Sequence, residues 1–187
     1  DGITALTSAT EAFNNVNIGN AGIAGTVTAQ GLTAIGGVLT VRNGTLNAND
    51  QALTINGNTI INGGILITGT GTVTFGDNAA VDTVTISSGE LQIESDDVEA
   101  DIDISNLLSW TNSGGTITYL GSSSSTTVFS SLAPYYNLVI NSGGSSFTQN
   151  KDFAVNNNLT ITAGTYDANN FILTIDGSTT INGGTLK

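Results

Sequence analysis

The residues best placed to do chemistry are carboxylates gathered in one stretch of the chain. Seven of the 15 acidic residues fall between Glu90 and Asp103. Acids alternate there with apolar residues, so a strand would carry four carboxylates on one face: those of Asp97, Glu99, Asp101 and Asp103. Such a row of oxygen ligands suits Ca²⁺, although neither an EF-hand loop nor a glycine-rich calcium repeat is present. The pattern predicts a calcium site or, alternatively, a solvated face whose charge repulsion discourages edge pairing.

Aromatic side chains form a second candidate site. The middle third of the chain carries Trp110, Tyr119, Tyr135 and Tyr136 around a serine-rich segment. Tyr and Trp combine an apolar body with a polar tip, which suits a groove that binds glycans. The same side chains would equally fill a widened core or cover the base of the serine-rich segment. The sequence leaves both interpretations open.

Threonine pairs offer a third possibility, an ice-binding face. Thr-x-Thr occurs at several places, for example at Thr83/Thr85 and Thr160/Thr162. A flat ice-binding surface needs one pair per turn at constant spacing, whereas these pairs are irregularly spaced. Exposed threonine favoured by strand propensity is the simpler explanation.

The sequence lacks most residue types that metal binding and enzyme catalysis usually require. The chain has no His, Cys or Met, which excludes imidazole or thiolate zinc sites, disulfides and Ser-His-Asp or cysteine nucleophile mechanisms. Asp96-Asp97 is a carboxylate pair, but no cationic partner lies near it in sequence. We therefore expect a non-enzyme, with no cofactor apart from the calcium that the acidic row would bind.

The net charge and the hydropathy of the chain indicate which partners it could bind. The net charge is −12, with Arg42, Lys151 and Lys187 as the three basic side chains, so we expect no nucleic acid to bind. No apolar run reaches the roughly 20 residues that span a bilayer, and we expect no membrane insertion. The low charge, the acidity and the abundance of Thr, Asn and Gly favour an exported protein, extracellular or at the cell surface.

The elements that position these residues are predicted to be strands. The sequence has 24 glycines and one proline, and 39% of its residues are hydrophobic while 10% are charged. Thr, Ile and Val favour strands, and Gly and Asn favour tight turns. The composition therefore predicts an all-β chain.

An internal repeat sharpens this prediction. Residues 39–66 align without a gap to residues 159–186, with sixteen of twenty-eight positions identical. Beneath it runs an apolar–x–apolar triplet, which places two apolar side chains on one face. Examples are Leu39–Val41, Leu53–Ile55, Ile65–Ile67, Val73–Phe75, Val84–Ile86, Leu91–Ile93, Ile102–Ile104, Ile117–Tyr119, Leu138–Ile140, Phe153–Val155, Leu159–Ile161 and Leu173–Ile175.

Triplets this short favour a β-solenoid over a sandwich, whose strands run to about five or six residues. At about 20 residues per turn the chain would make roughly nine turns, and parallel crossovers favour the right-handed form. We expect the solenoid, a parallel β-helix, over 33–187, with a serine-rich loop protruding near 121–134. Residues 1–32 fit the triplets poorly and are predicted to be a cap or a segment exchanged with a neighbour.

Three segments resemble a known family: Gly-Gly-Thr-Ile-Thr-Tyr-Leu-Gly-Ser (114–122), Tyr-Tyr-Asn-Leu-Val-Ile (135–140) and Asn-Leu-Thr-Ile-Thr-Ala-Gly-Thr-Tyr-Asp (158–167). They resemble modules of large exported bacterial surface proteins, the adhesins of the filamentous-haemagglutinin and autotransporter type. The resemblance covers roughly residues 110–187, and residues 33–67 through the internal repeat. It implies a right-handed β-helix at the cell surface.

The end of the second repeat copy suggests a function. The first copy runs on into further triplets, whereas the second stops at Leu186-Lys187, so its last turn would leave an uncapped edge at Ile181 and Leu186. A second copy of the chain would cover that edge, and head-to-tail contacts of this kind build filaments. We expect a self-assembling subunit of an extracellular filament or surface matrix. The alternatives are an adhesin fragment that binds a glycan or host surface and a calcium- or ice-binding module.

Overall fold

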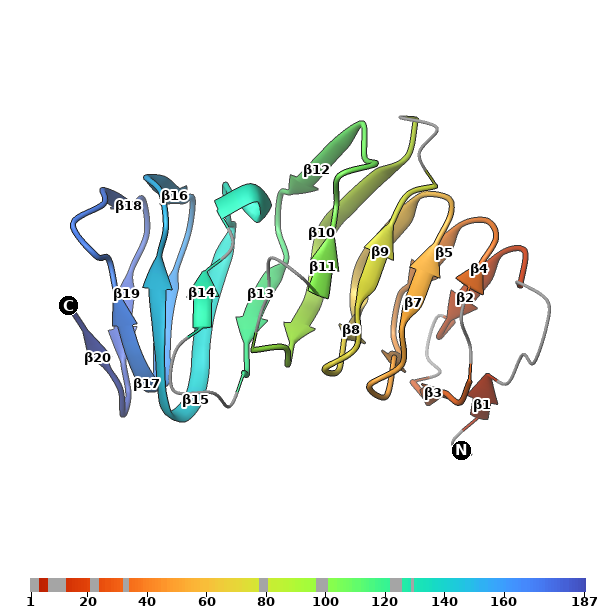
Figure 1. Cartoon of the computed structure of the whole chain (residues 1–187), viewed down its shortest axis with the longest axis horizontal. Coiled ribbons are helices and arrows are strands. Elements are labelled where there is room, and N and C mark those ends of the chain that lie inside the picture. Colours follow the sequence, from red (N-terminus) through yellow and green to blue (C-terminus); the bar gives the residue numbers. More distant parts are fainter. Residues whose placement is uncertain are drawn as a thin grey trace.

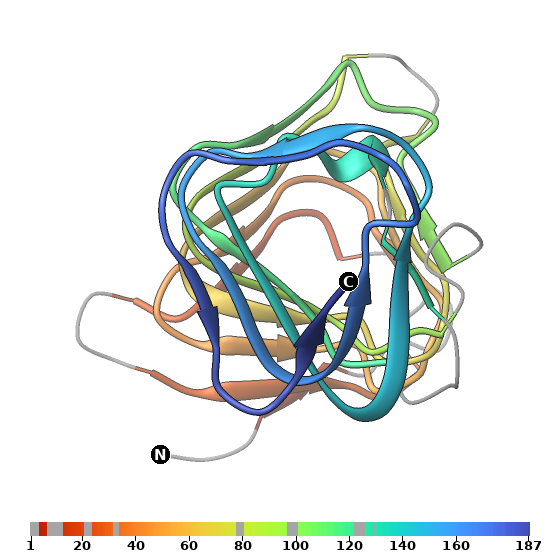
Figure 2. The same ribbon diagram turned by 90° about the vertical axis from the view of Figure 1, so that its left-hand side faces the viewer.

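The apolar triplets fold into short strands, and the chain coils so that successive turns stack in parallel along one axis (Figure 1). Figure 2 looks along that axis from the C-terminal end. This computed structural model describes residues 4–6, 13–20, 24–31, 34–77, 81–96, 101–121, 126–128 and 130–187. The predicted all-β solenoid is confirmed. No helix in the described part of the chain is long and apolar enough to cross a bilayer.

Three ladders of parallel strands form the N-terminal part of the solenoid. Ladder 1 comprises β2 (Val16–Ile18), β5 (Leu39–Val41), the first halves of β8 (Thr59–Ile67) and β10 (Thr83–Ile93), and β12 (Ser109–Asn112). Ladder 2 begins with β1 (Thr4–Leu6), β3 (Thr26–Ala29), β6 (Thr45–Asn47), the second halves of β8 and β10, and β13 (Thr116–Tyr119). Ladder 3 comprises β4 (Ala34–Ile35), β7 (Leu53–Ile55), β9 (Val73–Phe75) and β11 (Ile102–Asp103).

Ladder 2 continues through the C-terminal part and is joined there by two others. It adds the first halves of β15 (Asn137–Gln149) and β17 (Leu159–Asp167), and β19 (Thr179–Ile181). Ladder 4 comprises β14 (Thr126–Val128), the second halves of β15 and β17, and β20 (Thr185–Leu186). Ladder 5 comprises β16 (Phe153–Val155) and β18 (Leu173–Ile175), and a bridge from Tyr135 to Val155 extends it. A 3₁₀ turn, η1 (Ser130–Leu132), precedes this bridge.

The register of ladder 2 gives the length of each turn. Its successive partners are Val27, Leu46, Leu66, Leu91, Ile117, Leu138, Leu159 and Thr179, so that a turn takes between 19 and 26 residues. The chain makes about seven turns, fewer than the roughly nine expected. The two turns between residues 66 and 117 take 25 and 26 residues, rather than the 20 assumed, which accounts for about half a turn of the difference.

The alternation within each triplet sends its two apolar side chains into a shared core. On ladder 2, Leu46, Leu66 and Leu91 are fully buried one above another. All twelve predicted triplets overlap a strand of the structure. Burying such side chains supplies most of the folding free energy, at about 25 cal/mol per Å² of apolar surface.

Glycines and asparagines make the corners. A Cβ on Gly64 would lie 2.5 Å from the carbonyl oxygen of Gly44 in the preceding turn, so the close stacking of turns requires glycine there. Asn49 and Asp50 adopt positive φ angles of 54° and 59°, a conformation that Asn and Asp tolerate better than most residues. The Asn58 side-chain oxygen accepts a 2.8 Å hydrogen bond from the Thr83 backbone N–H, one turn further on. Corner side chains thus tie neighbouring turns together.

The two repeat copies occupy different ladders. Leu39, in the first copy, lies on ladder 1, whereas its equivalent in the second copy, Leu159, lies on ladder 2. Accordingly β8 bends from ladder 1 to ladder 2, but β17 bends from ladder 2 to ladder 4. The strands of the second copy therefore lie one ladder further around the coil than the equivalent strands of the first copy.

Two segments outside the predicted triplets contain regular structure. Within residues 1–32, β2 and β3 are parallel strands of the same solenoid, and Val16 and Ile18 form a further buried apolar pair. The predicted loop at 121–134 contains β14 and η1, and Val128 is buried. The serine run at 122–125 lies outside the described residues.

Candidate functional site

The C-terminal turn, formed by β18, β19 and β20, presents an open edge (Figure 2). Within the described residues each of these strands pairs on one side only: β18 with β16, and β19 and β20 with β17. Backbone N–H and C=O groups on the other side of each strand are therefore available for pairing. An edge of this kind is a template for another parallel strand.

The apolar side chains of this turn are exposed where their counterparts are covered. Ile181 is 49% exposed and Leu186 is 37% exposed. One turn earlier in the same ladders, Ile161 and Tyr166 are 0% exposed, and they are the register partners of Ile181 and Leu186. These are the two residues that the sequence placed at the edge. Exposure here follows from the absence of a further turn above them in the described chain.

The segment that leads into β18 adds to this surface. Phe171 and Ile172 are exposed, and the Ile172 N–H donates a 2.7 Å hydrogen bond to the Asp152 carboxylate of the preceding turn. The same turn carries Asn169 and Asn170 at positive φ, equivalent to Asn49 and Asp50 in the first repeat copy. The exposed apolar residues thus lie on a backbone that is held in the same form as an internal turn.

The aromatic candidates separate into buried and half-buried residues. Tyr119 and Tyr135 are fully buried, their hydroxyl oxygens lie 2.8 Å apart, and Phe147 packs edge-on against Tyr119. Burial raises the pKa of Tyr135 well above its usual range. Neither of these two side chains presents surface to a glycan or any other ligand in this structure. They fill the core, which the sequence had left as the alternative.

Trp110 and Tyr136 are half-buried. Trp110 lies on β12 and makes an edge contact with Phe75, with ring centroids 6.0 Å apart. Its indole Nε1–H is buried without a hydrogen-bond partner among the described residues. The structure therefore does not bring the four predicted aromatic residues together as one exposed groove.

The acidic row is only partly described. Asp97 and Glu99 lie outside the described residues, and Asp101 precedes the two-residue strand β11. The Asp101 carboxylate accepts hydrogen bonds from Ser95 Oγ and, at 3.4 Å, from Thr72 Oγ1. Asp103 accepts from the side chain and backbone of Ser105, which lowers its pKa. No group of three potential metal ligands occurs in the part of the chain that is described.

Sequence reasoning missed two features. Gln149 is a fully buried polar residue, whose amide donates to the Ile172 carbonyl and accepts from the Tyr166 hydroxyl. A pocket beside Arg42, lined also by Asn17, Gly19 and Asn20, was not anticipated because its residues come from two separate turns. The available signal was the presence of a single arginine in a region almost free of acids.

Comparison of the chain with protein families, with curated proteins and with solved structures finds no match. The resemblance to surface adhesins therefore still rests on the three sequence segments, and the fold on the structure itself.

Proposed function

We propose that the chain is a structural subunit of an extracellular filament or surface matrix, in which solenoids join head to tail. In this arrangement β18, β19 and β20 of one copy pair with the first turn of the next copy. The protein acts mechanically and not as an enzyme. Backbone hydrogen bonds and stacked apolar side chains continue from copy to copy along the fibre axis.

The exposure of Ile181 and Leu186 is the observation that carries the proposal. Ile181 repeats the position of the fully buried Ile161 in the preceding turn, but no turn of the described chain covers it. Covering both side chains with a further turn would remove apolar surface from water and satisfy the open strand edges together.

The uniform direction of ladder 2 is a second support. Every strand pairing from β1 to β19 in this ladder is parallel. A parallel contact between the last turn of one copy and the first turn of the next therefore repeats an arrangement that the chain already uses internally. Such a heterologous contact does not close on itself and gives an open filament.

Electron microscopy of the purified chain tests the proposal. We expect rods many times longer than one solenoid. Ile181→Asp places a charge in the open edge and should leave short particles, because a carboxylate buried in the contact would lack a partner. Thr160→Asp, which adds the same charge on the outward face of β17, is the matched control and should still form rods. A monodisperse monomer at high protein concentration contradicts the proposal.

A further inference from the structure

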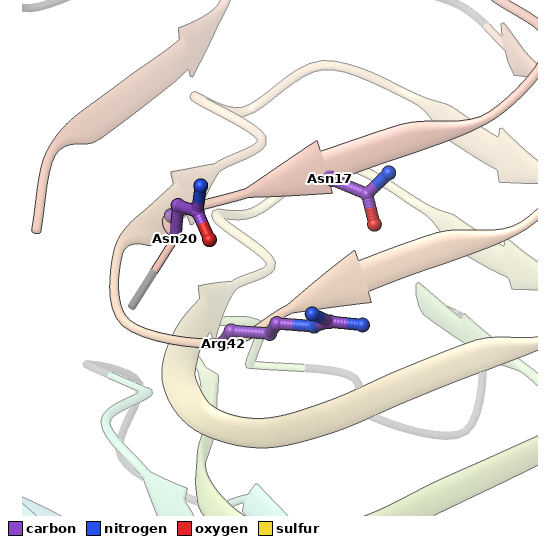
Figure 3. Close-up of a pocket in the computed structure, with 4 residues that line it drawn as sticks. Asn17, Asn20 and Arg42 are labelled. Atoms are coloured by element: carbon purple, nitrogen blue, oxygen red, sulfur yellow. The ribbon is translucent and has the colours of Figure 1, made fainter. Parts of the chain in front are cut away.

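An open pocket of about 550 Å³ lies where the first two turns meet, between β2 and β5 (Figure 3). Asn17, Gly19, Asn20 and Arg42 line it. Its volume falls in the range of small-molecule sites, about 300–1,000 Å³. Figure 3 shows the side chains of Asn17 and Arg42 on the same side of β2 and β5. Asn20 lies beyond the arrowhead of β2.

The backbone around the pocket is fixed by pairing between the turns. Asn17 is the register partner of Thr40, and the Arg42 N–H donates a 2.9 Å hydrogen bond to the Ile18 carbonyl. Asn43 Nδ2 donates to the Asn20 carbonyl at 3.0 Å. Arg42 and Asn17 therefore project from a backbone that is fixed in position, so the spacing of the two residues is set before a ligand binds.

The charge of the pocket is opposite to that of the protein. Arg42 is the single arginine of a chain with net charge −12, and from residue 12 to residue 76 the only acidic residue is Asp50. The Asp50 carboxylate accepts two hydrogen bonds from Thr70. The exposed guanidinium of Arg42 forms no ion pair and no side-chain hydrogen bond with the described residues. Among the described residues, no carboxylate compensates the charge of Arg42.

The chemistry of these groups selects a carboxylate that carries neighbouring hydroxyls. A guanidinium binds a carboxylate through two parallel hydrogen bonds, and an amide can both donate to and accept from a hydroxyl. Phosphate recognition usually recruits several cations, and the described lining has one. We infer that this pocket binds a uronic acid unit of an acidic polysaccharide, with Arg42 on the carboxylate and Asn17 on an adjacent hydroxyl.

Asn17, Gly19 and Asn20 belong to the first turn, which in the proposed filament would also contact the preceding copy. If both occur, each filament carries one pocket per copy, and a polysaccharide chain would bind several at once. The matrix and the polysaccharide would then reinforce each other through many weak contacts.

Isothermal titration calorimetry with a galacturonic acid trimer tests the inference, because it reads binding by monomer and filament alike. We expect heat that saturates, a loss of affinity of at least about tenfold in Arg42→Gln, and a smaller loss in Arg42→Lys, which keeps the charge but not the paired donors. Lys151→Gln, which removes an exposed cation elsewhere, is the matched control and should bind as the wild type does. Unchanged thermal unfolding of Arg42→Gln would show that the fold is intact.

Two comparison ligands make the result specific. A neutral galactose trimer should give no saturating heat, because it lacks the carboxylate. Inorganic phosphate should bind more weakly than the uronate trimer. Equal binding of the neutral trimer, tighter binding of phosphate, or uronate binding that survives Arg42→Gln would overturn the inference.

Discussion

The hydroxyl oxygens of Tyr119 and Tyr135 lie 2.8 Å apart inside the solenoid, where both side chains are fully buried. Tyr119 comes from ladder 2, and Tyr135 from the segment that extends ladder 5, so the pair joins two sides of the coil. A hydrogen bond between neutral hydroxyls satisfies both in a site from which water is excluded.

This pair makes the protein sensitive to alkaline pH. Burial raises the pKa of Tyr135, and also that of Tyr166. A tyrosine in the unfolded chain ionises at about pH 10. The native state therefore keeps protons that the unfolded state loses, and this contribution to stability is complete below about pH 10 and decreases as the pH rises further.

Urea denaturation between pH 8 and pH 11 measures this effect. The free energy of unfolding should fall above about pH 10, by up to about 1.4 kcal/mol per pH unit for each buried tyrosine. Tyr135→Phe should reduce the slope, although it leaves the Tyr119 hydroxyl short of one partner and lowers stability at neutral pH. Identical slopes for the two proteins would contradict the assignment.

The glycine corners should be intolerant of any side chain. Gly64→Ala should lower the free energy of unfolding by about 1–3 kcal/mol, because the new Cβ would overlap the Gly44 carbonyl and force the turns apart. Gly143→Ala is the control, since a Cβ there would meet nothing within 4 Å. We expect that variant to stay within about 0.5 kcal/mol of the wild type in urea denaturation. Equal losses at both positions would count against close stacking of the corners.

Asp50 should make stability depend on acid pH. Hydrogen bonds from the Thr70 backbone and then its side chain lower the pKa of Asp50, so the native state releases this proton more readily than the unfolded state does. The stabilisation is therefore present above the unfolded pKa, about 3.9, and is lost as the pH falls through the lower native value. Asn tolerates the same positive φ and keeps an acceptor.

Thermal unfolding of the wild type and of Asp50→Asn tests this dependence. The difference in Tm, wild type minus variant, should decrease as the pH is lowered from 6 to 2. Taking the difference removes most of the general effect of protonating the other acids. A difference that stays constant over this range would show that the Thr70 contacts do not favour the ionised carboxylate.

Ile161 and Ile181 form a matched pair for measuring burial by a further turn. In a dilute monomer, Ile161→Ala should cost about 2–5 kcal/mol of stability because it opens a cavity in the core. Ile181→Ala should cost much less, since the side chain is half exposed. Under assembling conditions the second variant should also weaken polymerisation. Equal costs in the monomer would mean that Ile181 is already covered.

The alternation of apolar residues was sufficient to predict the parallel solenoid and its core. Each triplet such as Leu53–Ile55 carries its own signal, because burial alternates with a period of two whatever the neighbouring turn. The exposed pair Ile181 and Leu186 was also predictable, since it follows from the same pattern.

Contacts between turns were not predictable in the same way. The longer turns between Leu66 and Ile117 change the turn count, and the shift that places Leu39 and Leu159 on different ladders depends on where the chain bends. Nothing in the repeat itself marks that shift. The Arg42 pocket likewise forms from residues more than 20 positions apart, which only the register of β2 on β5 brings together.

Disulfide trapping tests head-to-tail stacking most directly, because the chain has no cysteine of its own. Ala5 and Thr180 are the central residues of β1 and β19, the first and last strands of ladder 2, and they occupy the same register position. If ladder 2 continues between copies, residues 5 and 180 of adjacent copies would lie about 4.8 Å apart, within the Cα separation that a disulfide spans, about 4.4–6.8 Å.

The double variant Ala5→Cys with Thr180→Cys, oxidised and run on a gel without reductant, should give a ladder of covalent oligomers, while each single variant stays below the size of a trimer. Monomers only in the double variant, or dimers of the Thr180→Cys single variant as the main product, would contradict head-to-tail assembly.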